Sequence, residues 1–125
     1  MRKLQMTIAN VVIRAELFAT PTADAIYGSL PFSAKANTWG DEVYFSVPAS
    51  VSKEEDARAV VEAGELAFWV EGSSIAIGYG PTPISHGDEI RLAAPTNIWG
   101  RALDDVRLLA SVNNGDAIEV HAIHT

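Results

Sequence analysis

The chain contains no cysteine, which excludes disulfide bonds, catalysis by a thiolate and zinc sites built on sulfur. Basic residues are also scarce, because nine Lys and Arg stand against sixteen Asp and Glu, giving a net charge of −7. Nucleic-acid phosphates and anionic membranes bind clustered basic residues, so neither is an expected partner. The sequence instead favours a small molecule or a peptide as partner, and it leaves monomer and homodimer open.

No long hydrophobic run follows Arg2 and Lys3, because Gln5, Thr7 and Asn10 interrupt the apolar residues. The sequence therefore predicts neither a signal peptide nor a transmembrane segment. Together with the lack of cysteine, this predicts a cytoplasmic protein. A length of 125 residues predicts one domain over 1–125.

Several familiar functional motifs are missing as well. The chain has no Gly-x-Ser-x-Gly elbow, no phosphate-binding loop and no dinucleotide fingerprint, so no cofactor is expected. His86, Asp88 and Glu89 lie close together in the sequence, but their spacing matches no known ligand motif and a polar loop explains them. We therefore expect no metal site.

Alternating hydrophobicity is the main structural signal that is present. Around residue 44 it places Val43, Phe45 and Val47 on one face of a strand, with Glu42 and Tyr44 on the other. Gly40, just before this strand, indicates a bulge or a close approach of another backbone segment. Similar patterns predict eight strands, over 4–8, 11–17, 33–39, 41–47, 65–70, 75–79, 96–102 and 117–124.

Two short helices are predicted between these strands. Thr20 and Pro21 are typical of a helix start and Pro31 of a helix end, which predicts a helix over 20–31. Apolar residues at helical spacing predict a second helix over 103–112. Residues 84–95 are expected to form a long loop. Many short strands with closely spaced turns predict a mostly β fold, a closed antiparallel barrel.

Four sequence blocks carry a more specific likeness. NTWGDEVYF at 37–45, GELAFW at 64–69, GPTPIS at 80–85 and NIWGR at 97–101 resemble the signature of a cyclophilin-like family of small prokaryotic proteins. The resemblance implies the cyclophilin fold, an eight-stranded antiparallel barrel with a helix over each open end. It implies no particular reaction. The isomerase core of true cyclophilins, Phe-His-Arg followed by Gln-Gly-Gly-Asp, does not occur in this chain.

The candidate site is built around the polar face of the strand at 41–47. There a carboxyl group beside a phenol suits a ligand, although a solvated strand face explains the pair equally well. The aromatic residues at strand positions either pack the core or line a shared cleft. The predicted ligand-binding residues are Trp39, Glu42, Tyr44, Trp69, Tyr79, Thr82 and Trp99.

The sequence thus favours a small-ligand or peptide-binding module without prolyl isomerase activity. Isomerisation needs a cation at the prolyl nitrogen, whereas the central strand carries Asp41 and Glu42. Two alternatives stay open. One is an enzyme, either a residual prolyl isomerase or an unrecognised activity that uses Glu42, and the other is a protein-interaction scaffold.

Overall fold

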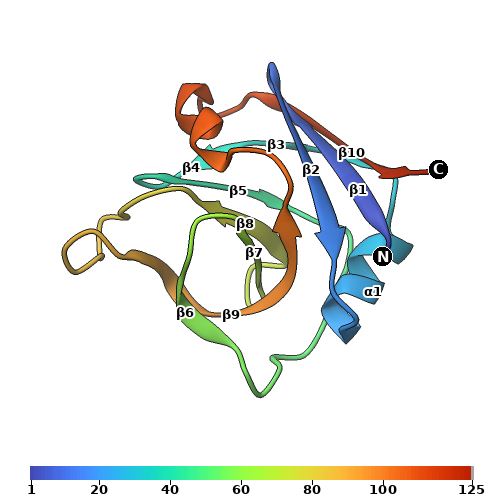
Figure 1. Cartoon of the computed structure of the whole chain (residues 1–125), viewed down its shortest axis with the longest axis horizontal. Helices are drawn as coiled ribbons and strands as arrows, with labels where there is room; N and C mark the ends of the chain where they lie inside the picture. Colours follow the sequence, from blue (N-terminus) through green and yellow to red (C-terminus); the bar gives the residue numbers. More distant parts are fainter. Residues whose placement is uncertain (125) are drawn as a thin grey trace.

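The computed structural model describes residues 1–124, whose strands curve around a common interior (Figure 1). Buried hydrophobic side chains fill this interior. These residues form ten strands and two short helices. In chain order the elements are β1 Lys3–Ile8, β2 Val11–Leu17, α1 Pro21–Gly28, β3 Phe32–Lys35, β4 Asn37–Thr38, β5 Glu42–Ser46, β6 Arg58–Val61, β7 Glu65–Trp69, β8 Ser74–Gly78, β9 Ile90–Ala102, the 3-10 helix η1 Val106–Ser111, and β10 Ala117–Ile123.

The strands close into an antiparallel barrel in the order β3-β10-β1-β2-β9-β7-β8-β5-β4. Ala36 alone separates β3, which pairs with β10, from β4, which pairs with β5. Residues 32–38 therefore act as one bent strand that joins the two ends of the sheet. With β3 and β4 counted together and β6 set aside as an addition to β9, the described residues form the predicted eight-stranded barrel.

Local signals set the first hairpin and α1 much as predicted. Ala9 takes a φ of 53° in the two-residue turn between β1 and β2. The Thr20 hydroxyl accepts a hydrogen bond of 3.1 Å from the Ala23 N–H, and Pro21 is the first helical residue. The helix ends at Gly28, before Pro31. No helix within residues 1–124 is long and apolar enough to cross a bilayer.

The second helix is shorter and tighter than predicted. Instead of an α-helix over 103–112, η1 is a 3-10 helix of six residues. Asp105 precedes it and accepts a hydrogen bond from the Arg107 N–H at 3.0 Å. Its inner side buries only Val106 and Leu109, for which a turn or two of helix is enough. In Figure 1, η1 and α1 lie on opposite sides of the strands.

The barrel interior holds the predicted apolar faces. Val43, Phe45 and Val47 are buried there as expected from the alternation along β5, and Phe68 and Ile77 join them. Trp99 is also fully buried in this interior, and its indole N–H donates a hydrogen bond of 3.1 Å to the Ala67 carbonyl. Burial of this many large side chains is the main source of stability for such a fold.

The prediction of a loop over 84–95 is wrong for its second half. Residues 90–95 are the first half of β9, and β6 pairs with them. This stretch contains Pro95, and a proline normally argues against a strand. Here it lies in an irregular part of the ladder, between the pairs Arg58–Thr96 and Val60–Arg91, where the regular hydrogen bonding is already broken.

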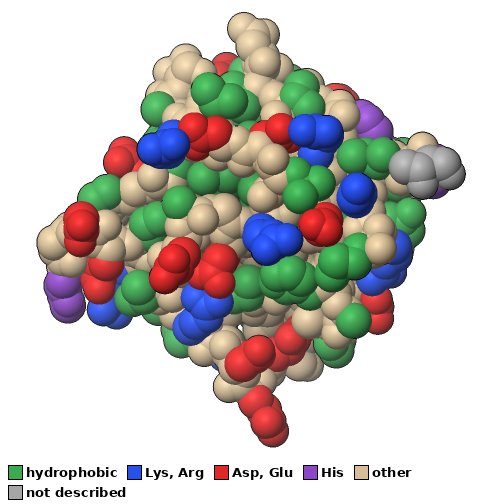
Figure 2. Space-filling model, in the orientation of Figure 1, with side chains coloured by type: hydrophobic (Ala, Val, Ile, Leu, Met, Phe, Trp, Pro, Cys, Tyr) green, Lys and Arg blue, Asp and Glu red, His purple; other side chains and the backbone are tan. Residues whose placement is uncertain are grey.

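Charged side chains are dispersed over the surface. On the face shown in Figure 2, acidic, basic and hydrophobic side chains are interspersed. Several arginines of the protein are paired with carboxylates: Arg14 pairs with Asp104 at 2.8 Å, and Arg91 pairs with Glu89 at 2.6 Å. Arg58–Glu65 and Arg101–Glu16 are further pairs of this kind.

Candidate functional site

The candidate site lies on the outer face of the barrel wall formed by β5, β8 and β7. Strand pairing places Tyr44, Ala76, Ala67 and Ile98 side by side in one row across this wall. Because side chains alternate along a strand, this row faces away from the interior that holds Phe45 and its neighbours. Alanines in the middle of the row leave room above the wall.

The first half of β9 and β6 cover part of this outer face. Ile90, Leu92 and Val61 pack against Ala67 and Ala76 in a second, smaller hydrophobic cluster. Gly78 makes the close approach feasible, since a Cβ at this position would overlap the side chain of Ile90. The wall is therefore two layers thick here, with a gap where β9 departs from regular pairing.

The gap is a partly enclosed cavity of about 140 Å³ with mostly apolar walls. An engineered apolar cavity of about 150 Å³ is large enough to bind benzene, so this space suits a single ring or a short branched chain. The lining residues are Trp39, Glu42, Tyr44, Trp69, Ala76, Leu92, Ala93, Ala94 and Thr96. Four of the seven residues predicted from the sequence are among them.

Glu42 is the unusual member of this set. It comes from β5, opposite Gly78, and only 5% of its surface is exposed. Within residues 1–124, its Oε1 is the one buried side-chain oxygen or nitrogen that has no hydrogen-bond partner. Burial raises the pKa of the Glu42 carboxyl to about 7. An unpaired carboxyl group in an apolar cavity destabilises a fold, so its presence calls for a functional explanation.

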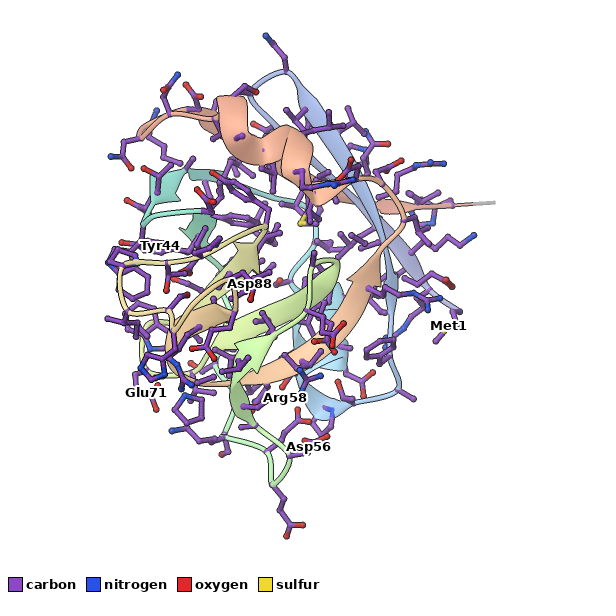
Figure 3. All side chains as sticks on the ribbon, turned by 60° about the vertical axis from the view of Figure 1, so that its left-hand side comes forward. Met1, Tyr44, Asp56, Arg58, Glu71 and Asp88 are labelled. Atoms are coloured by element: carbon purple, nitrogen blue, oxygen red, sulfur yellow. The ribbon has the colours of Figure 1, made fainter. Side chains whose placement is uncertain are left out.

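Three aromatic residues stand beside this carboxyl group. The rings of Tyr44 and Trp69 meet edge to face, with centroids 6.3 Å apart and an angle of 88° between their planes. A Cβ on Gly72 would overlap the Trp69 ring, so this glycine lets the indole lie over its own turn. Figure 3 shows Tyr44 at the edge of the molecule away from Met1. All three aromatic residues are partly exposed, which opens the cavity to solvent.

A tight turn holds Trp39 next to Glu42. The Trp39 N–H donates a hydrogen bond of 3.0 Å to the Glu42 carbonyl, and Gly40 between them has a φ of +58°. The Asp41 N–H donates to the Pro81 carbonyl at 3.0 Å. A Cβ on Gly40 would lie 2.9 Å from the Thr82 Cα, which confirms the predicted close approach of another segment.

Comparison with known proteins agrees with this architecture. The model of the cyclophilin-like family matches residues 2–121, nearly the whole chain. The chain belongs to the cyclophilin-like family. The solution structure of the hypothetical protein AF2241 from Archaeoglobus fulgidus is similar to this cyclophilin-like barrel, with a TM-score of 0.84 and 34% identity over 98% of this chain and 95% of that one.

A second solved structure shares the fold at low sequence identity. It is the structure of McbB in complex with tryptophan, with a TM-score of 0.69 and 14% identity. The match covers 94% of this cyclophilin-like chain but only 44% of McbB. At this identity the likeness shows the fold alone. No curated protein matches the chain.

Three predicted site residues of the cyclophilin-like chain lie outside the cavity lining. Trp99 is in the barrel interior. The Thr82 hydroxyl donates to the Arg91 carbonyl, and the Thr82 N–H donates to the Ser85 hydroxyl at 2.9 Å. The Tyr79 N–H donates to the Asp41 carbonyl at 2.8 Å. Tyr79 and Thr82 therefore brace the turn that carries Trp39 and Glu42.

The sequence prediction missed the other wall of the cavity. Its members are Ala76, Leu92, Ala93, Ala94 and Thr96. Four of them come from β9, and three of these, Leu92, Ala93 and Ala94, lie in the stretch interpreted as loop. Small residues at 76 and 78, in a strand that otherwise carries isoleucines, were the available signal, because they leave space on the face opposite the core.

The described part of the chain offers no cluster of side chains suited to a metal ion. Within residues 1–124, no three His, Cys, Asp or Glu side chains come together as ligands. His86 lies 3.8 Å from Glu89, which is itself engaged by Arg91. Arg91 in turn holds the pKa of the Glu89 carboxyl below its ordinary value.

Proposed function

We propose that this cyclophilin-like protein binds a small molecule in the cavity on its outer wall. The observation that carries the proposal is the combination of three aromatic residues with Glu42, whose buried Oε1 lacks a partner within residues 1–124. Ligand sites are typically apolar cavities with a few polar groups that fix orientation. A ligand with an apolar body and one polar end matches both parts of this lining.

The size of the cavity limits the ligand. A volume of about 140 Å³ accepts one ring rather than a fused polycyclic molecule, and a peptide would insert only one of its side chains. McbB, whose structure holds tryptophan, supports the idea that this fold accommodates small molecules. The position of the ligand on this chain is proposed from the cavity alone.

The absence of cysteine supports a cytoplasmic location.

A second candidate function is acid–base catalysis by Glu42. A carboxyl group with a pKa of about 7 is balanced between its two protonation states near neutral pH, which suits proton transfer to or from a bound substrate. This candidate shares the same cavity. Replacement of Glu42 by Gln separates the two functions, because it would abolish turnover in an enzyme while leaving binding of apolar probes in place.

The binding proposal is tested with the three tryptophans as reporters. Benzyl alcohol and phenol, each with a single ring, are titrated into ¹⁵N-labelled protein while the tryptophan indole N–H signals are followed by NMR. We expect the Trp39 and Trp69 signals to shift, and the Trp99 signal, which belongs to the interior, to stay in place. The signals are assigned with Trp39→Phe and Trp69→Phe variants.

A matched pair of variants shows whether binding occurs in the cavity. Ala94→Leu adds bulk to the cavity rim, and Ala110→Leu adds the same bulk at an exposed position on η1. We expect the first variant to weaken the ligand-induced shifts and the second to leave them unchanged. Equal shifts in both variants, or shifts confined to Trp99, would refute binding at this site.

A further inference from the structure

We propose that the ligand carries a primary or secondary ammonium group, which donates its N–H hydrogens to Glu42 while its apolar body rests against the aromatic residues. This inference rests on the proposed binding function and narrows the class of ligand. It is argued from the charges around the cavity, from the arrangement of the rings and from the hydrogen-bonding capacity left on Glu42.

The first argument is the missing counter-charge. The cavity lining contains one carboxyl group, and among the described residues that line it there is no Lys, Arg or His. A second acid, Asp41 in the turn before β5, lies outside the lining, and its carboxylate lies against Gly80. The cavity therefore has a negative group and no positive one, and a cation supplied by a ligand completes it.

The nearby arginines do not supply this charge, because each is paired elsewhere. Arg91, the basic residue of β9 next to the lining, contacts Glu89 through two hydrogen bonds of 2.6 and 3.3 Å. Arg58 on β6 pairs with Glu65 through two hydrogen bonds. On the strand of Glu42 itself, the side chain that shares the cavity lining with it is the Tyr44 phenol.

The second argument comes from the aromatic side chains. Ring faces carry partial negative charge and attract a cation, with tryptophan the strongest of the three types. Two of the rings, those of Tyr44 and Trp69, stand at 88° to each other and form two walls of a corner. With Trp39 and Glu42 also in the lining, the cavity combines aromatic faces with a carboxyl group.

The third argument selects among cations. Glu42 Oε1 is buried and has an unused capacity to accept hydrogen bonds within the described chain. A primary or secondary ammonium group donates N–H bonds to it, and such charge-assisted bonds are about twice as strong as neutral ones. A quaternary ammonium group has no N–H to donate and leaves the oxygen unsatisfied. Metal ions fit poorly, because one carboxylate in an apolar lining offers too few oxygen ligands.

Binding of an ammonium group is linked to the ionisation of Glu42. The cation pairs with the carboxylate and not with the neutral acid, so the protein is competent to bind only when Glu42 has lost its proton. For a carboxyl that titrates near pH 7, the competent fraction rises about tenfold between pH 6 and pH 8. The affinity for an amine that stays protonated over this range therefore rises about tenfold.

The test compares three probes that share one ring. Benzylamine, benzyl alcohol and benzyltrimethylammonium are titrated at pH 6 and pH 8, with the indole N–H signals of Trp39 and Trp69 as the readout. At pH 8 we expect benzylamine to bind at least roughly tenfold more tightly than either other probe. Benzylamine should gain about tenfold on going from pH 6 to pH 8, whereas benzyl alcohol, which carries no charge, should not gain.

Glu42→Gln is the decisive variant, and Glu62→Gln, at an exposed turn away from the cavity, is its control. The first should remove both the preference for benzylamine and its pH dependence, while benzyl alcohol still binds. Equal affinity for amine and alcohol in the unmodified protein, or an amine preference that survives Glu42→Gln, would overturn the ammonium inference and leave the binding function standing. If none of the three probes shifts the Trp39 or Trp69 signals, both proposals fall.

Discussion

Glu42 couples the stability of the fold to pH as well as shaping the cavity. Burial raises the pKa of its carboxyl group to about 7, from an ordinary value of 4.5. Between these two pH values the folded state holds a proton that the unfolded state has lost. Stability therefore falls as pH rises through this window, while below pH 4.5 both states are protonated and the penalty vanishes.

This linkage predicts a difference between the unmodified protein and Glu42→Gln, which has no proton to lose. The unmodified protein should lose up to about 3 kcal/mol relative to the variant between pH 4.5 and pH 8. Urea unfolding of both proteins at several pH values measures this difference. Arginine partners lower the pKa values of Glu65 and Asp104, so these two groups change the stability at lower pH. Both proteins contain them, so their contribution cancels when the unmodified protein is compared with Glu42→Gln. Parallel stability profiles would show that Glu42 titrates normally.

At the scale of elements, the turn over 39–42 and the segment over 80–85 form one unit. The backbone bond from Asp41 to Pro81 and the contact of Gly40 with Thr82 hold the turn against this segment. Two of the four blocks that identified the family thus meet in space. Together they fix the position of Trp39 and Glu42, while most of the remaining cavity lining comes from outside these two blocks.

A comparison of two glycines tests this unit. Gly40 and Gly115 both have positive φ, +58° and +88°, but a Cβ on Gly40 would meet Thr82 and Pro83, whereas Gly115 has open space around it. Gly115→Ala should lose about 1 kcal/mol from backbone strain. Gly40→Ala should lose about 1–3 kcal/mol more, because the added methyl group is overpacked. Equal losses in urea unfolding would show that the segments are not tightly packed.

The sequence predicted those features that depend on interactions between residues close together in the chain. Alternation fixed the inward face of β5, and the Thr20–Pro21 signal fixed the start of α1, because both depend on neighbours in the chain. The start of β9 was missed because its partner is β6, a strand with little pattern of its own. The aromatic residues of the cavity lining were among the predicted residues, whereas the small residues at 76 and 78 gain their meaning only from the packing of β9 over them.

At the scale of the whole molecule, the cyclophilin-like barrel does not by itself imply the chemistry of the prolyl isomerases. The strings of the isomerase core are absent, and Arg14, Arg91 and Arg101 are each paired with a carboxylate away from the cavity lining. A shared fold does not transfer a site.

We therefore predict that the protein does not accelerate cis–trans exchange in an Ala-Pro test peptide. Isomerisation has a barrier of ~18–20 kcal/mol, and lowering it needs a donor held in place at the prolyl nitrogen. The exchange rate should equal that in buffer, with an active cyclophilin as the positive control. An acceleration that disappears when Arg14, Arg91 or Arg101 is replaced would reverse this conclusion.

The pairing of β1 with β10 also decides when the barrel can close. Lys3 lies opposite Ile123, so β1 cannot complete its pairing with β10 until the chain has been synthesised as far as Ile123. At ~5–20 residues per second, the roughly 120 residues between them take on the order of 6–24 s to emerge from a ribosome. Until then one edge of β1 lacks its neighbour. The wall that carries the cavity, from β4 to β9, is synthesised before β10, so this wall is complete before the barrel can close.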